Sequence, residues 1–179
     1  MLGRLNGQEQ IMVIRGGRVA MMWAVTVSAV GMGMAATASA APEGAGSFHG
    51  VFTETATGAA SGYDIHGSVA MRIDSDGTAV TVNVSGLDPD KVYGSHLHNG
   101  TCASGGGGHY QNVEGGSRIP PNELWISTSG DGLVPNPGGV AHGVGAATWM
   151  ARVSSASTNA RSVVVHAPGG ARIACADLK

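Results

Sequence analysis

Glycine is the feature that most restricts how this chain can fold. Thirty of its 179 residues are Gly, about 17%, whereas soluble proteins usually contain ~7%. Each Gly inside a helix costs roughly 1 kcal/mol relative to Ala, which disfavours a helical bundle. The glycines follow no three-residue period and only seven residues are Pro, so a collagen-like chain is excluded. Only 12% of residues are charged and 42% are hydrophobic, which argues against disorder. The remaining possibility is a fold of short strands joined by glycine-containing turns.

Eight short segments have the residue types and the loose alternation of β-strands. They are residues 48–53, 63–73, 79–84, 92–98, 123–128, 146–153, 161–166 and 173–175. Two long glycine-rich loops are expected at 100–121 and 129–143. The sequence shows no repeat of solenoid length and no second domain. We therefore expect an all-β fold, an antiparallel sandwich or barrel.

The first forty residues have the pattern of a secretory signal peptide. Arg15 and Arg18 precede an uncharged stretch, 19–41, which ends in the cleavage pattern Ala38-Ser39-Ala40-Ala41. The alternative is a retained membrane anchor, because this stretch is long enough to span a bilayer. We predict cleavage after residue 40, a β-domain at 41–179, no membrane association afterwards, and export to the extracellular, cell-envelope or periplasmic space.

The charge of the exported domain limits its partners. Loss of residues 1–40 removes three Arg and one Glu, which leaves seven basic and eleven acidic residues and a formal charge of −4. No basic run or stripe is present, so a nucleic-acid partner is not expected. An anionic substrate would have to be attracted by local charges.

Two cysteines, Cys102 and Cys175, are present. An even number of Cys in an exported chain predicts a disulfide, here closing a loop of 73 residues. The alternative is a pair of metal thiolates, for which Cys175 lacks the neighbouring Cys or His that such sites use.

Histidines carry the predicted chemistry. His96 and His98 are two apart on a predicted strand, so both side chains lie on one face. His166 ends a Val-rich strand, and His109 lies in the first glycine-rich loop. Imidazoles without thiolates favour Cu, Zn, Fe or Ni over Ca or Mg, and Cu has the highest affinity. Spacing alone also allows two half-buried polar residues at His96 and His98. The remaining three histidines, His49, His66 and His142, are interpreted as surface residues.

Four motifs, the second of them in two parts, resemble one family in their order along the chain. The segment 84–98, VSGLDPDKVYGSHLH, is similar to the part of copper–zinc superoxide dismutases that runs from a strand through Gly-Leu to two copper-binding histidines. The segments 102–105 (CASG) and 108–112 (GHYQN) resemble the disulfide cysteine and the bridging histidine of that family. The segments 161–166 (RSVVVH) and 170–175 (GARIAC) resemble its last copper ligand, its guiding arginine and its second disulfide cysteine.

The resemblance implies a role for each matching residue. The copper ligands would be His96, His98, His109 and His166, and the disulfide would join Cys102 to Cys175. Arg172 would attract superoxide, and His109 would leave the metal in its reduced state. The implied protein is an exported Greek-key, immunoglobulin-like enzyme with one copper per chain, which converts superoxide to O₂ and hydrogen peroxide by Cu(II)/Cu(I) cycling.

Two departures from the family pattern resemble the copper-only superoxide dismutases. Two of the four zinc ligands have no counterpart, and a closed zinc site needs four. Only five residues separate His166 from Arg172, too few for the electrostatic loop of the family. Zinc is therefore not expected, although His142 could complete such a site. Glu123 either holds the far nitrogen of His109 in place of zinc or is an exposed loop carboxylate. The alternative function is a non-catalytic exported copper-binding protein for storage, delivery or sequestration. The sequence does not predict the oligomeric state.

Overall fold

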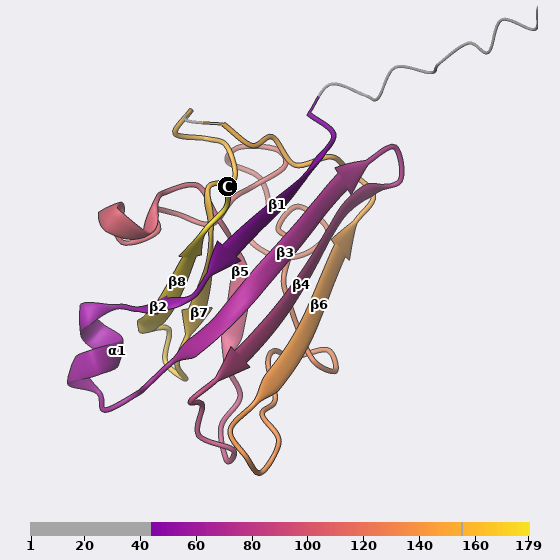
Figure 1. The fold of residues 1–179 in the computed structure, drawn as a ribbon. Helices are drawn as coiled ribbons and strands as arrows, with labels where there is room; N and C mark the ends of the chain where they lie inside the picture. The colour runs from indigo at the N-terminus through magenta and orange to yellow at the C-terminus, as the bar shows by residue number, and fades with distance from the viewer. Residues whose placement is uncertain (1–43, 155) are drawn as a thin grey trace, which may run out of the picture. The chain divides into compact units, whose positions relative to one another are not determined.

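Two four-stranded antiparallel sheets make up the fold (Figure 1). The computed structural model describes residues 44–154 and 156–179, so the predicted signal peptide at 1–40 lies outside the described residues. The first sheet has the order β1-β3-β4-β6, with β1 at Gly46–Val51, β3 at His66–Asp74, β4 at Gly77–Ser85 and β6 at Ala141–Ala147. The second has the order β2-β8-β7-β5, with β2 at Thr53–Glu54, β8 at Arg172–Asp177, β7 at Ser162–His166 and β5 at Gly94–His98. The predicted all-β class is confirmed. The Greek-key connections and the likeness to immunoglobulin domains stay predictions.

Side chains of both sheets form one hydrophobic core. On β3 and β4 the inward positions include Val69, Met71 and Val82, while their neighbours in the chain face solvent. Leu97 of β5 and Val163 of β7 belong to the same core from the second sheet. The period-two pattern expected for a sheet with one solvated face is therefore present in the first sheet, whereas β5, β7 and β8 of the second are buried at almost every position. No helix among the described residues is long and apolar enough to cross a membrane.

The first predicted strand, 48–53, is two strands in the structure. The break is at Phe52, whose side chain is buried in the core and whose N–H donates to Gly67 O of β3 at 2.9 Å. Beyond Phe52 the chain leaves the first sheet, and β2 pairs with β8 of the second. A short helix, α1 (Ala56–Ala60), follows, with Thr55 as its N-cap. The single segment 48–53 therefore passes from the first sheet to the second.

The predicted loop at 129–143 ends three residues too late and the predicted strand at 146–153 is misplaced, because β6 spans Ala141–Ala147. Its inward positions include Gly143 and Gly145, while Val144 is 64% exposed. A β-carbon at Gly143 would lie 2.3 Å from Leu133 Cδ2, and one at Gly145 would lie 2.5 Å from Trp125 O. Residues 124–133 thus fill the space over this strand. On this strand small Gly residues face inward and the larger Val144 faces solvent. A pattern of large apolar residues on the buried side, the usual sequence signal of a strand, is therefore missing.

The predicted strand at 123–128 is a connecting segment with isolated pairs. Ile126 N–H donates to Ser95 O of β5 at 2.8 Å, and Ser127 N–H donates to Val144 O of β6 at 3.0 Å. The segment therefore joins the edge strands of the two sheets and is not a strand of either one. It also places Trp125 opposite His96, with which it forms an isolated bridge.

Candidate metal centre

Four histidines from two strands and one loop come together on the outer face of the second sheet, the face turned away from the core. His96 and His98 share one face of β5, His166 ends β7, and His109 comes from the loop after β5. One ring nitrogen from each lies within 4.8 Å of those of the others. We call these four residues the histidine cluster.

The loop that carries His109 returns to pair with β5. Asn99 N–H donates to Gly108 O at 3.0 Å, and Tyr110 N–H donates to Leu97 O at 2.9 Å. Gly106, at φ +83°, allows the close approach, because a β-carbon there would lie 2.8 Å from Val164 Cγ2 and 3.5 Å from His98 Nδ1. Backbone pairing thus fixes the one ligand that no strand of the two sheets supplies.

Hydrogen bonds behind the cluster select the nitrogen that faces its centre. His166 Nδ1 lies 3.0 Å from Gly170 O, which only accepts, so Nδ1 carries the proton and Nε2 keeps its lone pair. His109 Nδ1 lies 2.8 Å from Glu123 Oε2, so the same reasoning leaves His109 Nε2 free. The Nε2 atoms of His98 and His166 are 3.1 Å apart. About 3 Å is expected between adjacent ligands of one ion that forms bonds of ~2.0 Å to imidazole.

Burial keeps the imidazoles of His96, His98 and His166 in the neutral form that binds metals. Desolvation, aided by the neighbouring imidazoles, lowers the pKa of His96 to about 3 and that of His98 to about 2. Desolvation also lowers the pKa of His166. His96 Nδ1 and His98 Nδ1 are buried and have no hydrogen-bond partner among the described residues. Buried polar nitrogens without partners are uncommon, and a bound ion would satisfy the lone pair of one that faces it. The donor set therefore fits an imidazole-ligated metal.

Glu123 is buried against the cluster. Its side chain is 1% exposed, and Oε2 accepts hydrogen bonds from His109 Nδ1 at 2.8 Å and from Trp125 Nε1 at 3.0 Å. Gln111 Nε2 donates to Oε1 at 3.4 Å. Of the two interpretations of Glu123, the exposed loop carboxylate does not describe this residue. The second nitrogen of His109 is thus occupied by a carboxylate. His142, the residue that could complete a zinc site, is exposed on β6 and lies outside the cluster.

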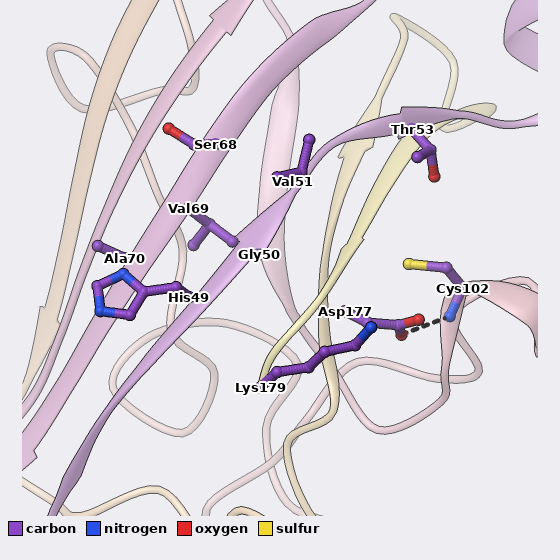
Figure 2. Close-up of a pocket in the computed structure, with 10 residues that line it drawn as sticks. All are labelled: His49, Gly50, Val51, Thr53, Ser68, Val69, Ala70, Cys102, Asp177 and Lys179. Carbon is purple, nitrogen blue, oxygen red and sulfur yellow. Dashed lines mark hydrogen bonds between the residues drawn. The ribbon is translucent and has the colours of Figure 1, made fainter.

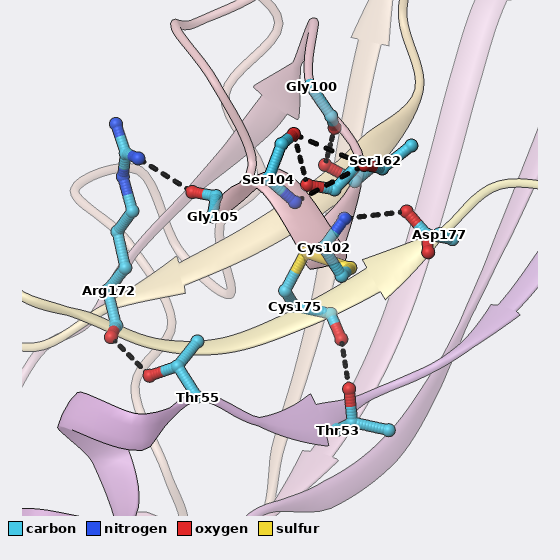
Figure 3. The surroundings of a disulfide bond; sticks show 11 residues. Thr53, Thr55, Gly100, Cys102, Ser104, Gly105, Ser162, Arg172, Cys175 and Asp177 are labelled. Atoms are coloured by element: carbon cyan, nitrogen blue, oxygen red, sulfur yellow. Dashed lines mark hydrogen bonds between the residues drawn. A yellow bond between two sulfur atoms is a disulfide. The ribbon is translucent and has the colours of Figure 1, made fainter.

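The predicted disulfide between Cys102 and Cys175 is confirmed. It joins the 3₁₀ turn Cys102–Ser104 to β8 (Figure 3). Cys102 N–H also donates to Asp177 Oδ1 of β8 at 2.8 Å. Arg172, at the start of β8, donates from Nη1 to Gly105 O, just beyond the turn, at 2.6 Å (Figure 3). The disulfide and this bond together hold the loop to β8.

A cavity of about 310 Å³ opens beside the cluster. It is lined by Gly108, His109, Gln111, Arg118, Glu123 and Arg172. Another cavity, of about 610 Å³, lies along β1, β3 and the chain end, and contains none of the four clustered histidines (Figure 2). Of these two cavities, only the smaller one is lined by a residue of the histidine cluster, His109.

Three residues near the centre were not identified from the sequence: Trp125, Gln111 and Arg118. The Trp125 ring lies 5.1 Å from that of His96, measured between centroids. Its position two residues after Glu123 on an extended segment was an available signal, because such residues share a face. Gln111 and Arg118 lie in a loop, where no period indicates their direction.

Neither a scan against protein-family models nor a search of curated proteins gives a match for this sequence.

Proposed function

We propose that this protein is an exported copper-dependent superoxide dismutase of the copper-only type. One observation carries the proposal: the four clustered imidazoles include His109, whose outer nitrogen is bonded to a buried carboxylate where the related two-metal enzymes bind zinc. Four imidazoles without thiolates suit copper, which also has the highest affinity in the divalent series. Bound copper would supply the Cu(II)/Cu(I) couple that oxidises one superoxide to O₂ and reduces another, with two protons, to hydrogen peroxide.

The histidine ligands would have different roles, according to how exposed each side chain is. His98 is fully buried and His96 is 8% exposed, so these two serve to hold the ion. The side chain of His109 is 32% exposed and lines the cavity. With copper bound, His109 would be the ligand able to hold and release a proton at Nε2, while Glu123 would keep the ring oriented through Nδ1.

Arg172 would attract the substrate. It lines the cavity beside His109, and its bond to Gly105 O holds the guanidinium near the opening. The exported domain has a formal charge of −4, so an anion is drawn toward the centre only by such a local positive charge. The disulfide supports the proposed exported location, because disulfides persist in oxidising compartments.

The test is superoxide turnover by the copper-loaded protein after a chelator has removed free copper. We expect turnover well above that of the buffer, and loss of both copper and turnover in His166→Ala. Arg172→Glu should keep its copper but turn over more slowly at low salt. The matched control is Arg72→Glu, which makes the same charge change on β3, where Arg72 pairs with Asp74. Tight copper binding without turnover would contradict the enzyme and favour the storage or delivery protein. Failure to bind copper would contradict both.

A further inference from the structure

A second arginine, Arg118, lines the cavity together with Arg172 and His109. The loop that carries it is braced by side chains at both ends. Asn122 Nδ2 donates to Val113 O at 3.0 Å and to Ser117 O at 2.8 Å, and Gly115 N–H donates to Gln111 Oε1 at 3.0 Å. Because Gln111 also contacts Glu123, this bracing fixes the backbone next to Arg118 relative to the metal centre.

The lining of the cavity has an excess of positive charge. Arg118 and Arg172 contribute two guanidinium groups, and Glu123 contributes the single carboxylate. That carboxylate is buried and already bonded to His109 and Trp125. Among the residues that the structure describes, no carboxylate forms a salt bridge with either arginine. The cavity therefore has two uncompensated guanidinium groups on a domain whose net charge is negative.

The cavity is also larger than a diatomic anion requires. Its volume of about 310 Å³ corresponds to about ten water molecules at ~30 Å³ each. An anion can therefore enter with part of its hydration shell, or as a larger oxyanion such as phosphate. Guanidinium groups suit such ligands, since they donate several hydrogen bonds in a fixed plane.

We infer that Arg118 acts with Arg172 as a two-arginine entrance that concentrates small inorganic anions above His109. Arg118 is a positioning residue for the approaching anion and is not a metal ligand. The inference rests on the proposed function and extends it. Only five residues separate His166 from Arg172, too few for the electrostatic loop of the family that the sequence resembles, and the two arginines would attract anions in place of that loop. It does not require turnover.

The experiment measures azide binding to the copper-loaded protein through the change in the visible absorption of Cu(II). In Arg118→Gln we expect azide affinity to fall about threefold at low ionic strength, the effect expected of one exposed charge. The difference should disappear near 1 M salt, where the Debye length is about 3 Å. Arg118→Lys should retain most of the affinity. The matched control is Arg72→Gln, which makes the same charge change far from the cavity and should bind azide like the wild type.

Unchanged azide affinity in Arg118→Gln would overturn the inference, and so would an equal loss in Arg72→Gln, which would indicate only net charge. Loss of azide affinity in Arg118→Gln, in a protein that shows no superoxide turnover, would reject the proposed enzyme and keep the entrance. If the cluster takes up no copper, the metal-free protein is titrated with inorganic phosphate, and the backbone amide NMR signals of Gly108 and Gln111 are followed. Shifts that weaken in Arg118→Gln would support the entrance, and their absence would overturn it.

Discussion

At the scale of single residues, the groups behind the imidazoles determine what the cluster can bind. Gly170 O and Glu123 each accept a hydrogen bond from one ring N–H, of His166 and His109 respectively, and so leave the other nitrogen as a ligand. Such outer partners fix both the tautomer and the ring orientation. Glu123 differs from the backbone carbonyl of Gly170 in that it also carries a negative charge. This charge would raise the basicity of His109 Nε2 and make it a stronger metal ligand.

Replacement of Glu123 tests this role. Glu123→Gln can still accept one hydrogen bond from His109 Nδ1, but it removes the charge. We expect copper affinity to fall about 10- to 100-fold, the usual effect of losing such a partner. Competition with a chelator of known affinity measures the loss. Glu114→Gln is the matched control, because Glu114 is exposed in the same loop and should leave copper affinity unchanged. Equal affinity in wild type and Glu123→Gln would contradict the role.

The sequence predicted residues on strands better than residues in loops. His96 and His98 could be placed on one face because a strand alternates strictly, and the Val-rich run before His166 indicated a buried strand. The burial of Glu123 could not be settled from the sequence, because it depends on His109 and Gln111, which reach it from the preceding loop. Arg118 could not be predicted at all, since the bonds made by Asn122 decide the course of its loop.

At the scale of secondary-structure elements, β6 shows why a strand can be missed. Glycines occupy its inward positions because residues 124–133 lie over it, so its sequence has no buried apolar side to detect. Space, rather than hydrophobic burial, selects the residues of this strand. The same close contact positions the segment that carries Glu123 and Trp125.

Gly145→Ala tests the close contact between β6 and this segment. The added β-carbon would lie 2.5 Å from Trp125 O and 2.6 Å from Leu124 Cδ2, so the backbone or the side chain must shift. Overpacking of this kind costs about 1–3 kcal/mol, which lowers the melting temperature by several degrees. Thermal unfolding measures the effect. Val144→Ala, at an exposed position of the same strand, should unfold within about a degree of the wild type. Equal melting of Gly145→Ala and wild type would contradict the contact.

The disulfide is a second element-scale constraint, since it joins the 3₁₀ turn Cys102–Ser104 to β8. The chain-entropy model gives about 4.5 kcal/mol for a loop of 73 residues, as an upper figure. Reduction of the metal-free protein should therefore lower its melting temperature by up to about 15 °C. The double variant Cys102→Ser/Cys175→Ser should melt at the lower temperature with or without reductant. Two thiols that titrate in the folded, non-reduced protein would reject the disulfide.

At the scale of the whole molecule, the two sheets act as a frame for the loops. Each of β5 and β7 is five residues long, yet together they supply three of the four clustered histidines. The connecting segment 124–127 and the disulfide then hold the loops over the outer face of this sheet. The frame could be predicted from alternation and glycine content, whereas the connections between its edges could not, because they consist of isolated backbone pairs.

The metal content of the whole chain is the last prediction. We expect one copper per chain and no stoichiometric zinc, because Glu123 occupies His109 Nδ1 and His142 lies exposed on β6. Copper should raise the melting temperature, since a ligand at 1,000 times its Kd stabilises the folded state by about 4.1 kcal/mol. Zinc added after copper should give no further rise. Elemental analysis after loading with both metals, together with the melting curves, checks this. His142→Ala should behave like the wild type. One copper and one zinc per chain, with the zinc lost in His142→Ala, would show a two-metal enzyme instead.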